Sequence, residues 1–123
     1  MLKYETAELL DDQLLDDQLL EIIAKRMSAM GDVTRLKILQ WLIQREEMSV
    51  TQLCEAVGAR PSNISQHLSV LFNAELVGKR KEGNNVFYYI HSEMVKTVCS
   101  AVCESLRTDL MGKGELLEKI PVH

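Results

Sequence analysis

Cys99 and Cys103 are the two side chains whose type and spacing best suit the binding of a ligand. They lie four positions apart in a stretch whose apolar residues have helical spacing. This spacing puts both sulfurs on one face of a helix, with about 6 Å between the Cβ atoms. Thiolates at this separation can bridge one soft, thiophilic ion. The pair therefore predicts a soft-ion site on a helix.

Two other interpretations of this pair stay open. The same stretch carries apolar residues at helical spacing, namely Val95, Val98, Val102 and Leu106. A free cysteine packs as a small apolar side chain, so the pair can be purely structural. It can also be a redox switch, although two cysteines four apart on an intact helix rarely reach disulfide geometry without distortion. The odd total of three cysteines argues against a disulfide scaffold.

A second set of polar side chains lies in the segment 49–76, which predicts two short helices joined by a turn. Ser49 followed by Gln52 forms a capping box at the start of the first helix. Gly58 supplies the left-handed residue that ends this helix, and Pro61 fits the first turn of the next one. Two helices joined by a short turn that contains glycine are typical of a helix-turn-helix, whose second helix enters the major groove of DNA.

The second of these helices has an apolar face, formed by Ile64, Leu68 and Leu71. Its other face carries small polar side chains and one imidazole: Ser62, Asn63, Ser65, Gln66 and His67. Because side chains of these types bind base edges and phosphates, we expect them to contact DNA. The alternative is an ordinary helical hairpin whose polar face is only solvated.

The segment 76–90 predicts a β-hairpin with a positively charged strand. Its first strand ends in three consecutive basic residues, Lys79, Arg80 and Lys81. Residues 82–85 have the composition of a turn, and residues 86–90 are β-branched or aromatic. A hairpin directly after a recognition helix is a wing. We expect its basic residues, together with Arg60, to bind DNA phosphates.

The distribution of charge agrees with this assignment, although the net charge of the chain is −4. Residues 1–24 contain one lysine against seven aspartates and glutamates, whereas residues 60–81 contain four basic residues against one glutamate. The basic part coincides with the predicted recognition helix and wing, where an electrostatic footprint for nucleic acid belongs.

Helices are also predicted on both sides of these DNA-binding elements. Residues 1–30 predict a helix with a broad apolar arc, because the repeated unit LLDDQ has a five-residue period. Such an arc needs more partner surface than one small domain offers, which predicts dimerisation. The other predicted elements are a helix at 33–45, a connector at 46–48, a helix at 92–110 and a tail at 111–123. The expected fold, α-α-α-α-β-β-α, is mainly helical with a small β-hairpin.

Size and composition limit the function further. With 123 residues, 46% of them apolar and 26% charged, residues 1–123 are expected to form one globular domain. We find no secretory signal and no apolar run near the roughly 20 residues of a membrane span, which predicts a cytoplasmic protein without a membrane partner. His67, His91 and His123 form no ligand spacing, and no catalytic motif stands out. We therefore expect no enzymatic activity.

Taken together, these motifs resemble the ArsR/SmtB family of bacterial winged-helix repressors. The resemblance spans roughly residues 25–106, and its matching stretches are 30–39, 49–54, 62–68 and 83–89. It implies a homodimer built from the first and last helices. It further implies that this homodimer binds a palindromic double-stranded operator without a cofactor and releases it when an inducer binds.

The inducer sites usual in this family are not matched by the sequence. Similar repressors for arsenic carry a Cys-x-Cys pair where this chain has Ser49 and Thr51, and only Cys54 matches the trailing thiol. Similar zinc sensors place ligands on the last helix where this chain has Ser92 and Met94, which are not good zinc ligands.

The resemblance therefore leaves Cys99 and Cys103 as the expected inducer site, since last-helix cysteines serve as soft-ion ligands in some members. As(III) and Sb(III) favour three sulfur ligands, and Cys54 is the only other cysteine of the chain. We expect As(III) or Sb(III) as the metalloid inducer, ahead of Cd(II) or Pb(II). The third ligand would come from Cys54, from the second subunit or from an added thiol. A redox-responsive repressor and a repressor with purely structural cysteines remain the alternatives.

Overall fold

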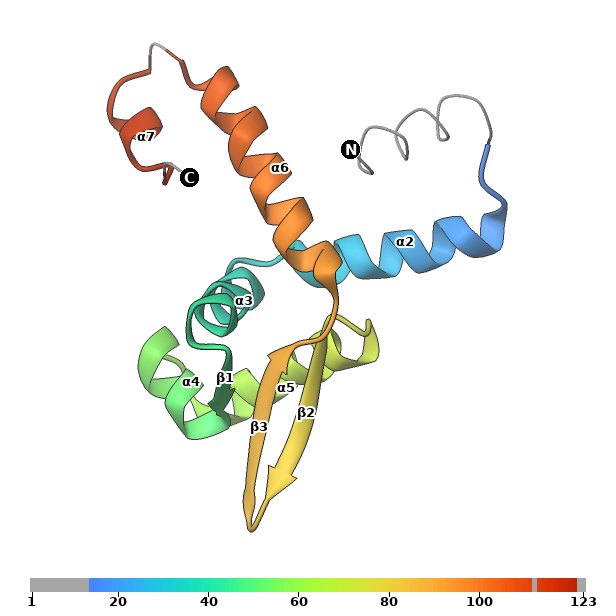
Figure 1. The fold of residues 1–123 in the computed structure, drawn as a ribbon, viewed down its shortest axis with the longest axis vertical. Helices are drawn as coiled ribbons and strands as arrows, with labels where there is room; N and C mark the ends of the chain where they lie inside the picture. Colours follow the sequence, from blue (N-terminus) through green and yellow to red (C-terminus); the bar gives the residue numbers. More distant parts are fainter. Residues whose placement is uncertain (1–13, 112, 122–123) are drawn as a thin grey trace.

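The structure, a computed structural model, describes residues 14–111 and 113–121. In chain order these residues form α2 (Asp17–Met30), α3 (Val33–Arg45), β1 (Glu47–Ser49), α4 (Val50–Val57), α5 (Pro61–Asn73), β2 (Val77–Glu82), β3 (Asn85–Ile90), α6 (Glu93–Asp109) and α7 (Glu115–Glu118), as shown in Figure 1. Residues 1–13 of the predicted first helix and residues 112, 122 and 123 of the predicted tail lie outside the described residues.

The helices begin where the sequence offers capping side chains. The residues before α2, α3, α4 and α6 each accept a hydrogen bond from a backbone N–H of the first turn: Asp16, Asp32, Ser49 and Ser92. At α4 both bonds of the capping box are present, since Ser49 accepts from the Gln52 N–H at 3.2 Å and Gln52 accepts from the Ser49 N–H at 2.9 Å. Gly58 ends α4 in the left-handed conformation, with φ of 79°. These local signals therefore set the two helices of the predicted helix-turn-helix.

The sheet has three antiparallel strands in the order β1-β3-β2, so β3 lies in the centre. The predicted hairpin is confirmed as β2 and β3, and the mainly helical fold class is confirmed with it. The prediction that residues 46–48 only connect two helices was wrong. Residues Glu47–Ser49 form β1 because the second edge of β3 offers free backbone groups, and Glu47 pairs with Tyr89 in that ladder.

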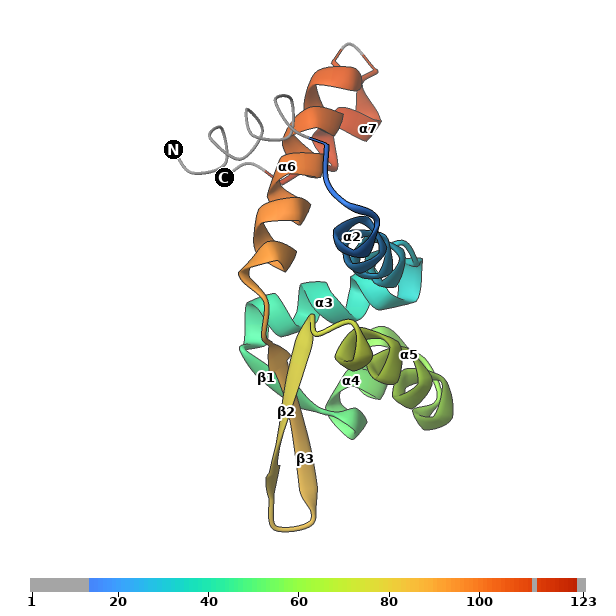
Figure 2. The ribbon, with the colours of Figure 1, turned by 90° about the vertical axis from the view of Figure 1, so that its right-hand side faces the viewer.

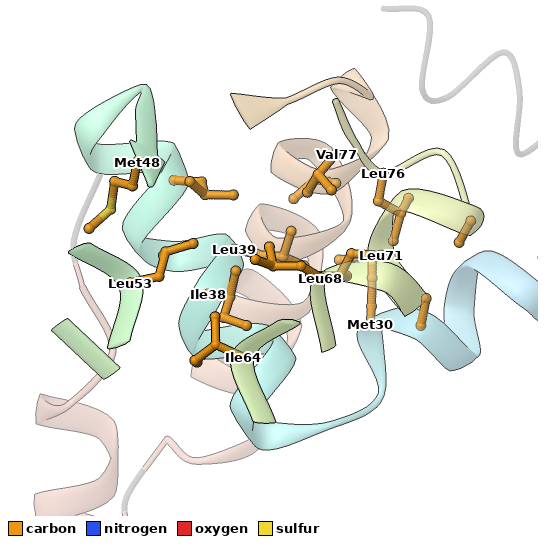
Figure 3. Close-up of a cluster of buried hydrophobic side chains, with 14 residues drawn as sticks. Met30, Ile38, Leu39, Met48, Leu53, Ile64, Leu68, Leu71, Leu76 and Val77 are labelled. Atoms are coloured by element: carbon orange, nitrogen blue, oxygen red, sulfur yellow. The ribbon is translucent and has the colours of Figure 1, made fainter. Parts of the chain in front are cut away.

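The core holds α5 in place against α3 and the sheet. Ile64 and Leu68 of α5 are completely buried and lie beside Ile38 and Leu39 of α3 (Figure 3). Figure 2 shows that the β2–β3 hairpin extends from one side of this core, whereas α2 and α6 lie on the opposite side. The core thus separates the wing from the two helices that carry the cysteine pair and its neighbours.

Part of the predicted tail has structure that the sequence did not indicate. The short helix α7 follows α6, and Ile120 just beyond it is only 8% exposed. Arg107 of α6 donates a hydrogen bond to the carbonyl of Pro121. The described part of the tail therefore folds back on α6.

Candidate DNA-binding surface and thiol groove

The polar face of α5 is open to solvent, as a helix that reads DNA requires. Its predicted contact residues Ser62, Asn63, Ser65 and Gln66 are all exposed, and so is Arg60 just before the helix. The helix starts with Pro61, which has no N–H and so removes one of the donors that would lack an intrahelical partner in the first turn. Ser69 was not among the predicted contact residues, but it extends the polar stripe because it is exposed and lies four positions after Ser65.

His67 is placed differently from the other predicted contact residues of α5. Its side chain is only 19% exposed and lies toward the start of α3. Its Nδ1 atom is 3.1 Å from Nη1 of Arg35 and 3.8 Å from Oδ2 of Asp32. His67 therefore bonds within the protein, which the helical spacing of α5 alone did not indicate.

The wing presents its basic side chains on two different faces. Side chains alternate across a strand, so Lys79 and Lys81 share a face with the buried Val77, which is the face that packs on the core. Nζ of Lys79 lies 4.4 Å from the centre of the Phe72 ring of α5. Both lysines are exposed, so they lie on the side of the wing that faces the recognition helix and remain accessible.

Arg80 points to the other face of the wing, where carboxylates of its own chain hold it. Its Nε and Nη2 atoms donate to the two oxygens of Glu47 at 2.9 and 2.5 Å, and its Nη1 donates to Glu82 at 2.8 Å. The hydrogen bond from Arg80 lowers the pKa of the Glu47 carboxyl. Arg80, which was predicted to bind phosphate, thus links β2 to β1 across β3.

The cysteine pair lines a groove between α2 and α6 with a volume of about 420 Å³. Most of the lining is apolar and comes from Ile22, Ile23, Met27, Met30, Val98 and Val102. Cys99 and Cys103 both lie in this lining and are half-buried, which agrees with their predicted common helix face. Burial, and to a lesser degree the neighbouring Cys103, raises the pKa of the Cys99 thiol. The raised pKa favours the protonated thiol of Cys99.

Cys54 lies on α4 and packs against the core, apart from the lining of this groove. Among residues 14–111 and 113–121, no three side chains of the types His, Cys, Asp and Glu are grouped so that they could hold a metal. A three-thiolate site of Cys54, Cys99 and Cys103 is therefore not formed within one described protomer, because the α4 thiol and the α6 thiols belong to different parts of the fold.

A recognition helix with an open polar face, docked on two other helices and flanked by a lysine-bearing hairpin, defines a winged helix-turn-helix DNA-binding protein. Residues 32–79 match the family described as bacterial regulatory protein, arsR family. The chain is 38% identical to the HTH-type transcriptional regulator MJ1325 of Methanocaldococcus jannaschii, over 68% of this chain and 94% of that protein. The chain therefore belongs to the ArsR family of DNA-binding transcriptional regulators, which are not enzymes.

Other relatives and solved structures agree with this assignment. The transcriptional regulator KmtR of Mycobacterium tuberculosis is 38% identical over 61% of this chain, but the match spans only 57% of the length of KmtR. The arsenical resistance operon repressor of Bacillus subtilis is 32% identical over 74% of this chain and 84% of that protein. The described helices include none that is long and apolar enough to cross a membrane.

Two solved structures share the fold. The crystal structure of NolR from Sinorhizobium fredii has a TM-score of 0.67 with 37% identity, covering 75% of this chain and 94% of that one. The solution structure of a homodimeric winged helix-turn-helix DNA-binding domain of Mb0332 from Mycobacterium bovis has a TM-score of 0.66 with 26% identity, covering 89% of this chain and 98% of that one.

Proposed function

We propose that this chain is a repressor that binds a palindromic double-stranded operator as a homodimer and releases it on capturing As(III) or Sb(III). In this proposal residues 49–90 read the operator, while the helices within 1–30 and 92–110 form the dimer and sense the inducer. The observation that carries the proposal is that Cys99 and Cys103 line one groove, between the two helices expected to dimerise.

Exposed apolar side chains support the dimer. On α2, Leu19 and Leu20 are 46% and 48% exposed, and on α6, Val102 and Leu106 are 58% and 42% exposed. Apolar surface of this kind on two neighbouring helices is typical of a protein interface. The homodimeric Mb0332 domain has the same fold. A twofold axis through this region would present two α5 helices to half-sites about one helical turn of DNA apart.

For DNA binding we propose Ser62, Asn63, Ser65 and Gln66 as the residues that contact base edges. Arg60, Lys79 and Lys81 would bind phosphates. Their exposure supports this division, and so does the position of both lysines on the α5 side of the wing. His67 and Arg80 are left out of these contacts because Nδ1 of His67 and the guanidinium of Arg80 already bond within the chain.

The protonated state of Cys99 favours arsenous or antimonous acid over a divalent cation. When As(OH)₃ meets two thiols, two As–O bonds break, two As–S bonds form, and each hydroxyl leaves with a thiol proton as water. Arsenic stays trivalent, so no oxidant or reductant is needed. A remaining hydroxyl or a small-molecule thiol completes the arsenic coordination in this scheme. Cd(II) or Pb(II) must instead displace both thiol protons, which the raised pKa of Cys99 opposes.

The binding of a labelled palindromic fragment from the promoter of the protein's own gene tests this proposal. Arsenite or antimonite should release the fragment from the parent protein and from a Cys54→Ser control. A Cys99→Ser/Cys103→Ser variant should bind the fragment equally well but keep it bound in the presence of either ion. Release of the double variant by arsenite would remove the groove thiols from the mechanism. Release by peroxide but not by arsenite, with a disulfide in the mass spectrum, would favour the redox-responsive repressor. No release by either would favour purely structural cysteines.

A further inference from the structure

The C-terminal end of α2 is capped by a side chain from the next helix. The last carbonyls of a helix have no partner within it, and basic side chains there satisfy them. The last turn of α2 has no basic residue of its own. Arg35 of α3 donates there instead, because its Nε donates to the Ala29 carbonyl at 2.6 Å and its Nη2 to the Ser28 carbonyl at 3.3 Å, which also accepts from the Gly31 N–H at 3.0 Å.

The same guanidinium also reaches the recognition helix. Its Nη1 lies 3.1 Å from Nδ1 of His67 on α5. A guanidinium has only donors, so Nδ1 accepts this hydrogen bond and the proton of the neutral imidazole is on Nε2. Asp32 holds the start of α3 in register by accepting from the backbone N–H of Arg35 at 3.0 Å. One planar, three-way donor thus joins the end of α2 to α5.

The end of α2 is also a wall of the thiol groove. Met27, Met30 and Gly31 line the groove on either side of the two carbonyls that Arg35 holds. A movement of the α2 end relative to α6 would therefore move these carbonyls. An ion pair from α2, between Arg26 and Glu75 at 3.6 Å, is weak because the Glu75 side chain is 73% exposed.

We propose that Arg35 is the positioning residue through which the groove between α2 and α6 acts on the recognition helix. The inference rests on the proposed function for its biological meaning, since it describes how occupation of the groove reaches α5. Movement of the α2 end shifts the guanidinium, and the guanidinium shifts His67, one position after Gln66 of the polar face. Lysine keeps the charge but lacks the planar fork, so Arg35→Lys should break the three-way link.

Contact alone does not establish coupling, so the test must measure transmission. In isotopically labelled protein that carries Cys54→Ser, N-ethylmaleimide fills the groove by alkylating Cys99 and Cys103. We expect alkylation to shift the NMR signals of the Arg35 Nε–H and of the His67 ring. With Arg35→Lys the His67 response should be lost, whereas the matched control Arg26→Lys should keep it.

A second pair of variants tests the link from the side of α5 and does not depend on whether Arg35→Lys folds. Asparagine places an oxygen acceptor near the position of Nδ1, whereas leucine has none. The backbone amide signal of Gln66 should therefore follow alkylation in His67→Asn but not in His67→Leu. An equal shift of the Gln66 amide signal in both His67 variants would overturn the proposal. An unchanged His67 response in Arg35→Lys would also overturn it, and so would the absence of any response in the parent protein.

Titration of the operator complex with arsenite distinguishes a failure of this coupling from a failure of the proposed function. If alkylation is transmitted through Arg35 but arsenite does not release the operator, the inducer is wrong and the coupling stands. If arsenite lowers the operator affinity of Arg35→Lys by the same factor as that of the parent protein, the coupling does not pass through Arg35. The ratio of operator affinity without arsenite to operator affinity with arsenite is usually about 5 to 150 for coupled sites. We expect this ratio to fall to about 1 in Arg35→Lys.

Discussion

Alanine substitutions in the wing should separate three neighbouring basic residues that look equivalent in the sequence. Lys79 and Lys81 lie on the α5 side of β2 and are exposed. The guanidinium of Arg80 lies on the other side and donates to Glu47 and Glu82. We therefore expect Lys79→Ala and Lys81→Ala to remove phosphate contacts, and Arg80→Ala to leave the number of phosphate contacts unchanged.

The size of the effect follows from counterion release. Each phosphate contact contributes about 0.9 to the slope of log affinity against log salt concentration, and a dimer with two wings loses two contacts for each lysine. The slope should therefore fall by about 1.8. Between about 50 and 200 mM salt, the parent protein should lose roughly twelvefold more affinity than either lysine variant.

Fluorescence anisotropy with an operator duplex and with a scrambled duplex measures these slopes. The lysine variants should weaken binding to both duplexes alike, because phosphates carry no sequence information. Arg80→Ala should keep the parent slope but unfold at a lower temperature, since it releases β1 from β2. An equal fall of the slope in Arg80→Ala would show that Arg80 leaves its carboxylates for DNA, and an unchanged slope in both lysine variants would refute this placement of the wing.

Three further predictions concern the groove thiols, the cap of α4 and the base of the wing. Because burial raises the pKa of Cys99, Cd(II) affinity should rise by about tenfold per pH unit for each displaced thiol proton. Arsenite affinity should stay nearly constant across neutral pH. Calorimetric titration measures both affinities. Ser49→Ala removes an observed capping box and should lower the free energy of unfolding in urea by about 1 kcal/mol. A Cβ on Gly78 would lie 2.5 Å from the Tyr89 ring. Gly78→Ala should therefore lower the free energy of unfolding by about 1 kcal/mol.

Each of these predictions has a matched control. Parallel pH profiles for Cd(II) and arsenite would contradict the neutral thiol at Cys99, and the Cys54→Ser protein should repeat the parent profiles. Thr51→Ala changes an exposed residue of the same helix turn. If it lowers the free energy of unfolding as much as Ser49→Ala does, the capping box is not the cause of the stabilisation. For Gly78→Ala, the control is the same substitution in a Tyr89→Ala protein, which lacks the ring. If Gly78→Ala still lowers the free energy of unfolding there, the strain does not come from Tyr89.

Much of the fold was predictable because its signals are local. Ser49, Gly58 and Pro61 act within a few residues of their own positions, so the two central helices follow from neighbours in the chain. Strand β1 was not predictable, since three residues are too short to show an alternating pattern. It exists because β3 offers a free edge.

The candidate site divides in the same way. The common face of Cys99 and Cys103 follows from their spacing on one helix, and both line the groove. The relation of this pair to Cys54 depends on how distant helices pack, and no spacing along the chain contains it. Likewise, residue type predicted polar contacts for His67 and Arg80, but His67 bonds to Arg35, 32 positions away, and Arg80 to Glu47, 33 positions away.

The sequence by itself determined where α3, α4 and α5 begin, the charged hairpin and the paired thiols, because capping, turn formation and helical periodicity are interactions between near neighbours. Only the tertiary structure decided which wing side chains stay free for phosphate, that His67 turns to Arg35, and that the cysteine pair faces α2 across a groove. Those outcomes depend on which surfaces meet when the apolar side chains of separate elements are buried together.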